Sequence, residues 1–163
     1  MPQEPGELDT DGMAIMAQAI ALEGYTFADF AGFDEKALEP AYALAFNMIN
    51  QSQYYEAEKL LVWLAGLDQY QAKYFMGIGI CRQQMGRPEK AVQAYAMAGM
   101  LEVTNPVPAL RAAECYLAMG MLEEAWSGCK AALHWAGKKP EHAALRSRAE
   151  ALLAAVERKK GDA

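Results

Sequence analysis

The side chains best suited to chemistry are few and far apart. The two histidines, His134 and His142, flank a proline, and neither has cysteine or carboxylate neighbours at the spacing of a metal site. Cys81 has no histidine near it in the sequence that would activate it as a nucleophile. We therefore expect no catalytic residues, no metal and no cofactor, and surface or structural roles for both histidines.

One glycine pair resembles part of a nucleotide-binding loop. Gly77 and Gly79 lie within a helical pattern and are not followed by Gly-Lys-Ser/Thr, which a phosphate-binding loop requires. Glycines inside a helix allow a neighbouring helix to approach closely. We interpret the pair as a packing feature, and no nucleotide is implied.

A period of 34 residues organises the chain. Small residues recur at this spacing in several columns, and so do turn residues and prolines: Ala57, Ala91 and Ala125; Ala45, Gly79 and Ala113; Ser52, Gly86 and Gly120; Pro106 and Pro140. A fixed repeat of this length indicates a helical hairpin that must stack on its neighbours to bury its apolar side. This pattern is typical of a scaffold rather than an enzyme.

Apolar spacing, glycines and prolines set the expected helices. Pro40 is expected near a first turn, because a later proline would remove a backbone hydrogen bond. Between residues 25 and 33 the aromatic, glycine-broken segment is expected to be a packed connector with one helical turn. The expected helices span about 11–23, 34–51, 54–66, 69–85, 88–101, 106–119, 122–136 and 140–160.

Composition indicates a single globular unit. Of the 163 residues, 53% are hydrophobic and 22% are charged, and no apolar run approaches the roughly 18 residues that span a bilayer. The first residues lack the basic and apolar stretches of a secretory signal, so a cytoplasmic protein is expected. Three cysteines are an odd number, which argues against a disulfide framework.

Charge is unevenly distributed. The net charge is -6, which argues against nonspecific nucleic-acid binding. Residues 1–40 carry nine acidic side chains and one lysine, whereas residues 138–160 carry seven basic and three acidic ones. Two interpretations stay open: solvated ends, or complementary potentials that orient a partner or a second subunit.

The repeat columns resemble the tetratricopeptide repeat. The second unit matches its signature best, through Phe75, Ile78, Gly79, Gly86, Ala91, Tyr95 and Ala98. The first unit departs from it, with Ser52 at the turn glycine and Ala41 where an aromatic residue is common. The implied fold is all-α: three tetratricopeptide repeats in a right-handed superhelical array, with an N-terminal amphipathic helix and a C-terminal capping helix. The expected division is an N-terminal helix and connector (1–33), repeats at about 38–71, 72–105 and 106–139 within 34–139, and a cap with tail (140–163).

In such an array the first helix of each pair lines the concave side. The residues not used for stacking are then expected to form a groove that holds an extended peptide. Large apolar residues at helical spacing also suit a core, so this alternative stays open for the aromatic members. The expected groove residues are Tyr42, Phe46, Ile49, Asn50, Leu67, Tyr70, Lys73, Met76, Ile80, Gln83, Val107, Leu110, Glu114 and Leu117.

A narrower resemblance covers roughly residues 30–158. The chain is similar to the type III secretion chaperones of translocator proteins through the strings LEPAYALAF, YYEAEKLL, GIGICRQQMG, AVQAYAMAGML and PALRAAECYLAMG. It departs from that family in its first forty residues and at Ile49, where an aromatic residue is typical. The alternatives are a generic tetratricopeptide adaptor for another protein's peptide segment and, least favoured, an enzyme.

The chaperone resemblance implies partners. It implies a groove for a Pro-x-Leu-x-x-Pro-like segment near the N-terminus of a hydrophobic, pore-forming translocator, with two different translocators using one chaperone. It also implies a homodimer formed through the N-terminal helix, for which we expect Met13, Met16 and Ile20 to supply the contacts. Neither nucleic acid nor direct membrane insertion is implied.

Overall fold

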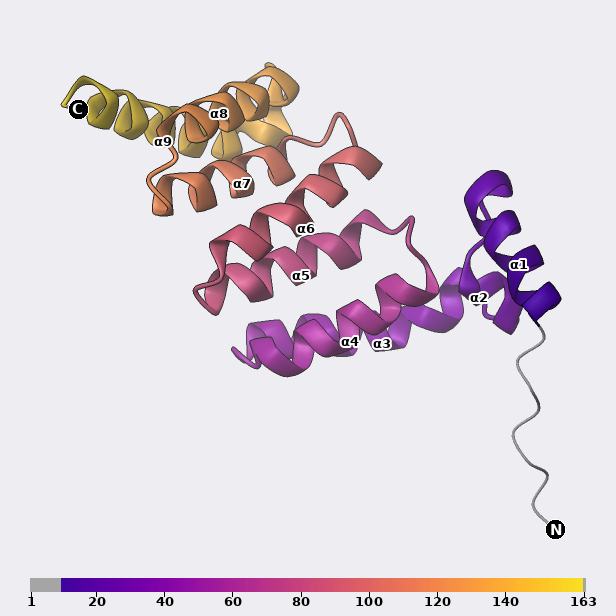
Figure 1. Cartoon of the computed structure of the whole chain (residues 1–163). Coiled ribbons are helices and arrows are strands. Elements are labelled where there is room, and N and C mark those ends of the chain that lie inside the picture. Colours follow the sequence, from indigo (N-terminus) through magenta and orange to yellow (C-terminus); the bar gives the residue numbers. More distant parts are fainter. Residues whose placement is uncertain (1–9, 163) are drawn as a thin grey trace, which may run out of the picture.

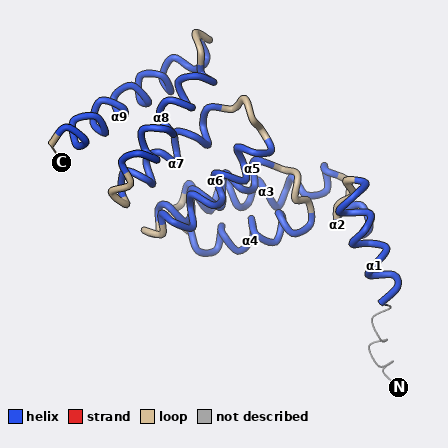
Figure 2. The backbone as a smooth tube through the Cα atoms, turned by 45° about the horizontal axis from the view of Figure 1, so that its top comes forward, coloured by secondary structure: helices blue, strands red, loops and turns tan. Residues whose placement is uncertain are grey.

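The structure is a computed structural model that describes residues 10–162, excluding the side chains of residues 10–13 and 35. In this part of the chain every regular element is helical, as the repeat pattern predicts (Figures 1 and 2). The helices are α1 (Thr10–Gln18), which continues as a π-helical turn (Ala19–Glu23), α2 (Phe27–Ala31), α3 (Glu35–Asn50), α4 (Tyr54–Leu67), α5 (Ala72–Gln84), α6 (Pro88–Leu101), α7 (Pro106–Ala118), α8 (Leu122–Ala136) and, after a 3-10 turn (Pro140–His142), α9 (Ala143–Gly161).

Helices α3 to α9 form a stack of antiparallel layers. Each helix packs against the next in the sequence, and α9 also contacts α7, so the last helix covers the final hairpin. Figure 1 shows the layers following one another from α3 and α4 to α8 and α9, with α1 and α2 beside the α3–α4 end. The hydroxyl of Tyr70 donates to the carbonyl of Ile20 (3.4 Å), which links the N-terminal segment to the α4–α5 loop. The predicted all-α stack is confirmed.

The turn within each hairpin has the same backbone conformation. Ser52, Gly86 and Gly120 are spaced by the repeat period, and their φ angles are 61°, 70° and 74°. A left-handed φ costs glycine little and most other residues about 1 to 2 kcal/mol. Ser52 therefore adopts the geometry of its repeat column without the residue type that suits it.

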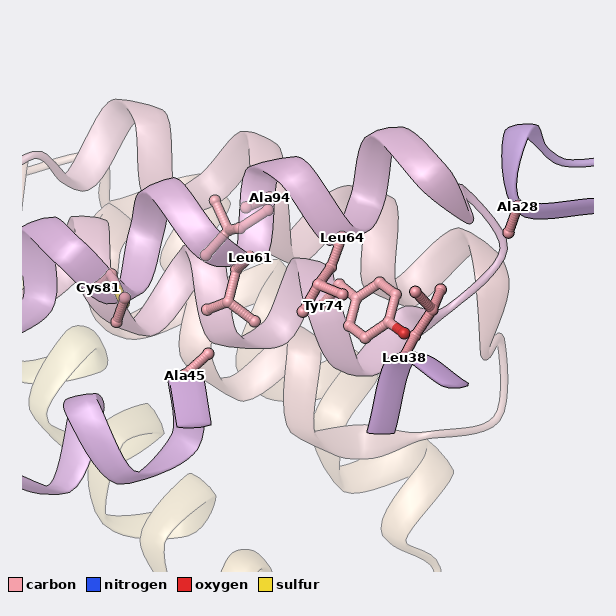
Figure 3. Packing of buried hydrophobic residues seen from close by; sticks show 10 residues of the cluster. Ala28, Leu38, Ala45, Leu61, Leu64, Tyr74, Cys81 and Ala94 are labelled. Carbon is pink, nitrogen blue, oxygen red and sulfur yellow. The ribbon is translucent and has the colours of Figure 1, made fainter. Parts of the chain in front are cut away.

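Small residues bring the helices close together. Ala57, Ala91 and Ala125 are fully buried, and a Cβ placed on Gly79 would lie 2.4 Å from the Tyr95 ring. Figure 3 shows the core at the N-terminal end of the stack, where Leu61, Leu64, Tyr74 and Ala45 belong to one buried cluster. The alanine and glycine columns thus set the interhelical spacing.

Two expected helix starts and the expected place of Pro40 differ from the structure. Helix α3 begins at Glu35, so Pro40 lies in its second turn, and the backbone hydrogen bond that Lys36 would accept there is absent. Helix α5 begins at Ala72 rather than near Gln69, because Asp68 folds the preceding residues into a turn: its carboxylate accepts from the Tyr70 amide and the Gln71 side chain. At Pro140 the chain forms a 3-10 turn before α9.

A search of residues 10–162 for a helix long and apolar enough to cross a bilayer finds none.

Candidate peptide-binding groove

A cavity of about 230 Å³ lies between the first helices of two successive hairpins. Its walls come from α3, α4 and α5, and its mouth includes the loop between α6 and α7. We call it the anchor pocket. Its lining residues are Tyr42, Phe46, Ile49, Leu61, Lys73, Met76, Gly77, Ile80, Glu102 and Asn105.

Six of the expected groove residues meet in this pocket. Tyr42, Phe46 and Ile49 follow one another at helical spacing, so they share one face of α3. The face of α5 opposite them contributes Lys73, Met76 and Ile80 by the same periodicity. Together these side chains make a mostly apolar wall, with one ammonium group.

The pocket floor is made by a leucine and a glycine. Leu61 is fully buried, and a Cβ on Gly77 would lie 2.7 Å from its Cδ1 atom. The missing side chain at position 77 therefore leaves room for Leu61 under the pocket. We expected close packing from Gly77, but not a place in this lining.

The two aromatic walls differ in exposure. The Tyr42 ring is partly buried and packs against that of Tyr74, with centroids 5.7 Å apart and an interplanar angle of 49°. The Lys73 ammonium lies 5.0 Å from the Tyr42 centroid and forms an ion pair with Glu39. Phe46 has 53% of its surface exposed although it is strongly apolar. Burying such a side chain under a partner lowers the free energy of the complex, because apolar surface is removed from water.

Sequence reasoning missed four residues of the lining. Gly77 was assigned to packing alone, Leu61 was not among the expected groove residues, and Glu102 and Asn105 lie outside the first helices to which the groove was assigned. Asn105 carried one signal, because asparagine before a proline is typical of a helix start. Its Oδ1 indeed accepts from the Val107 amide (3.0 Å) at the start of α7.

Other expected groove residues lie elsewhere. Asn50 is exposed at the end of α3, and Leu67 packs against the first core cluster. Tyr70 is exposed, and its hydroxyl is bound to the N-terminal segment. In the third repeat Val107 and Leu117 are half-buried and do not line the anchor pocket.

Leu110 requires a correction. Only 4% of its surface is exposed, because it packs with Ala132 and Ala149 where α7, α8 and α9 meet. The capping helix α9 supplies one side of this cluster. Leu110 is thus a core residue and does not present its side chain to a peptide.

A polar network connects the second repeat, α7 of the third repeat and α9. Tyr95 donates to Gln83 Oε1 (2.6 Å), and Gln83 donates to Glu114 (3.4 Å). Glu114 also pairs with Arg111 (3.5 Å) and with Arg148 of α9 (2.6 Å). Burial raises the pKa of Tyr95, so its hydroxyl stays a donor at neutral pH. Gln83 and Glu114, both expected in the groove, are thus held by other side chains of this network.

The N-terminal helix carries a second apolar surface. Met16, Ala17, Ile20 and Phe27 line a cavity of about 370 Å³, and Ile15 and Leu22 of the same segment are exposed. Two of the three expected dimer contacts, Met16 and Ile20, line this cavity. The side chain of Met13 lies outside the described residues.

The three cysteines are buried in the stack. Burial raises the pKa of Cys81, Cys115 and Cys129 to about 11, so all three thiols stay protonated at neutral pH. Within residues 10–162 no cluster of histidine, cysteine and carboxylate side chains has the arrangement of a metal site.

Stacked helical hairpins with alanine and glycine columns at a fixed period place the protein in the tetratricopeptide-repeat class. No family model matches the chain. Low calcium response locus protein H of Yersinia pseudotuberculosis is 34% identical over 152 residues, which cover 93% of this chain and 90% of that protein. A T3SS complex from Aeromonas hydrophila contains a chain that superimposes with a TM-score of 0.86 at 37% identity, over 91% of this chain and 97% of the other.

A further solved structure specifies the family. The type III secretion chaperone SycD of Yersinia enterocolitica, in complex with a peptide of the translocator YopD, aligns with a TM-score of 0.76 at 36% identity, over 78% of this chain and 97% of SycD. SycD has also been solved in an alternative dimer. The present chain belongs to the family of type III secretion translocator chaperones.

Proposed function

We propose that this protein is a cytoplasmic chaperone of a bacterial type III secretion system. It binds hydrophobic translocator proteins through the anchor pocket and the adjoining surface of α3 and α5, and keeps them soluble and unassembled before secretion. The observation that carries the proposal is the convergence of Tyr42, Phe46 and Met76 on one open apolar pocket. Membership in the translocator chaperone family supports the choice of client.

The mechanism is passive holding of an extended client segment. Apolar side chains of the segment enter the pocket, and its backbone lies along polar groups at the rim. Met76 adapts to anchors of different shape, because methionine is unbranched and flexible. Three apolar anchors at about 1.5 to 3 kcal/mol each, less the cost of ordering the peptide, correspond to micromolar to nanomolar binding. Release at the secretion apparatus requires no chemistry by this chain.

Co-expression tests this function. A translocator from the same secretion system is expressed alone, with the wild-type chain, and with the variant Tyr42→Ala/Phe46→Ala. We expect the wild type to bring the translocator into the soluble fraction and the double variant to lose this rescue, because two pocket walls are removed. Circular dichroism checks that the variant stays helical.

The control replaces two aromatic residues that lie away from the pocket. Tyr55 and Trp63 are on α4, with 56% and 53% of their surfaces exposed. The variant Tyr55→Ala/Trp63→Ala removes a similar apolar area and should keep the rescue. Rescue that survives in the Tyr42/Phe46 variant would contradict the pocket assignment.

A further inference from the structure

Besides Tyr42, the anchor pocket has three polar lining residues, and two of these three are already engaged. The Lys73 ammonium is paired with Glu39 and lies near the Tyr42 ring. The Asn105 amide donates to Glu102 Oε2 (2.7 Å), while its oxygen caps α7. Neither residue keeps its main polar group free for a ligand.

Glu102 differs from these two. One of its carboxylate oxygens accepts from Asn105, and among the described residues the other has no hydrogen-bond or ion-pair partner. No arginine, lysine or histidine of residues 10–162 forms an ion pair with Glu102. The mouth of a mostly apolar pocket thus carries one uncompensated negative charge.

The local backbone holds this carboxylate in place. The Asn105 amide N–H donates to the Glu102 carbonyl (3.0 Å), which closes a tight turn between α6 and α7. Pro106 restricts Asn105 to an extended conformation, and its φ and ψ are -78° and 118°. The turn and the side-chain hydrogen bond therefore fix Glu102 relative to the pocket before any ligand arrives.

We infer that Glu102 is a specificity-determining residue, which selects client segments that carry a lysine or arginine beside the apolar anchor. Asn105 acts as its positioning residue. This inference rests on the proposed function, since it concerns the chemistry of the segment that the anchor pocket holds. A charge pair at an open rim contributes modestly and mainly excludes wrong partners, because water screens it and like charges repel.

Synthetic peptides test the inference. The probes share a Pro-x-Leu-x-x-Pro frame in which each x position in turn is lysine, glutamine or glutamate, and fluorescence anisotropy gives their dissociation constants. At one x position we expect the lysine peptide to bind the wild-type chain about two- to five-fold more tightly than the glutamine peptide. The glutamate peptide should bind more weakly than both. Added salt should narrow these differences.

Variants assign the preference to one carboxylate. Glu102→Gln should bind the lysine and glutamine peptides equally, and Glu102→Lys should prefer the glutamate peptide. Glu89→Gln, which changes an exposed carboxylate at the other end of α6, should keep the wild-type preference. A lysine preference that persists in Glu102→Gln, or equal binding of all peptides to the wild type, would overturn the role of Glu102 and leave the proposed function intact. Absence of binding by every peptide to the wild type would overturn both.

Discussion

At the scale of single residues, Gly79 of α5 and Gly99 of α6 differ in the space available for a side chain. The site of a Cβ at Gly79 is filled by the Tyr95 ring, whereas at Gly99 the nearest atom is Pro108 Cβ at 3.7 Å, an ordinary contact. Both residues lie inside helices, where glycine is less favourable than alanine by up to about 1 kcal/mol. The same substitution should therefore have opposite effects at the two positions.

We predict that Gly79→Ala lowers the free energy of unfolding by about 1 to 3 kcal/mol, because the added methyl group overpacks the contact with Tyr95. Gly99→Ala should leave it unchanged or raise it by up to about 1 kcal/mol. Urea unfolding followed by circular dichroism measures both values. Equal effects of the two variants would contradict the tight packing of the Tyr95 ring of α6 against Gly79 of α5.

The cysteines lead to a second prediction at this scale. All three are buried and have pKa values raised to about 11, so thiolate is scarce near pH 8. A thiol-reactive disulfide such as Ellman's reagent should modify none of them in the folded protein, and all three in urea. Rapid release of one equivalent of chromophore from the native protein would contradict this expectation.

The sequence predicts some residues of the anchor pocket but not others, and the difference has physical causes. Tyr42 and Met76 could be predicted, because repeat register identifies which face of a first helix is not used for stacking. Glu102 could not be, since it belongs to a turn whose path depends on how α6 and α7 pack. Ser52 lies between these cases: the repeat column predicts its turn, but serine alone does not predict a left-handed backbone.

At the scale of elements, one glutamate links three parts of two hairpins. Glu58 of α4 bonds to Arg82 of α5 (2.6 Å) and to Arg87 of the α5–α6 turn (3.0 Å). Burial alone would raise the pKa of Glu58, but its hydrogen bonds and the charges of both arginines outweigh that effect and lower it. The ionised form is therefore stabilised in the folded state relative to the unfolded chain.

This lowered pKa fixes the sign of a pH dependence. A carboxyl group with a lower pKa when folded contributes stability that is fully present above its ordinary value, 4.5, and is lost as the pH falls through the folded value. We predict that Glu58→Gln lowers the free energy of unfolding by roughly 1 to 2 kcal/mol at pH 7. The difference from wild type should shrink as the pH falls below 4.5.

Thermal or urea unfolding between pH 3 and pH 7 measures this difference. Glu150→Gln is a suitable control, because Glu150 is exposed in the middle of α9 and no ion pair of the described residues involves it. The control should change stability little at any pH. A Glu58→Gln penalty that stays constant from pH 7 to pH 3 would contradict the electrostatic account.

Helix boundaries show where local sequence signals suffice. The bounds of α6 and α8 match the prediction, because proline, glycine and the alanine columns all specify them. The third-repeat groove was predicted less well, since Leu110 and Glu114 are covered or paired by residues of α9. The repeat pattern describes how equivalent hairpins pack, but it does not specify which side chains of α9 cover or pair with residues of α7.

At the scale of the whole molecule, the N-terminal segment exposes several large apolar side chains. Ile15, Leu22 and Phe27 are exposed on this segment, and Phe27 lines a cavity together with Met16 and Ile20. Surfaces of this kind favour association with a partner. We propose that a second copy of the chain covers this one.

We predict that deleting residues 1–24 lowers the oligomeric state from dimer to monomer, as measured by light scattering. Met16→Glu/Ile20→Glu in the full chain should do the same, because two charges enter the proposed interface. Circular dichroism of both variants verifies that the repeats stay folded. An oligomeric state that neither change alters would rule out a dimer built on this segment.

The polar network from Tyr95 to Arg148 has a consequence for stoichiometry. A second extended segment lying along α7 would have to break the ion pairs that Glu114 forms with Arg111 and Arg148, and breaking such pairs costs free energy. Under the proposed function, all client segments are then expected to use the anchor pocket between α3 and α5. One copy of the chain is therefore expected to bind one client at a time, and the proposed dimer is expected to bind two.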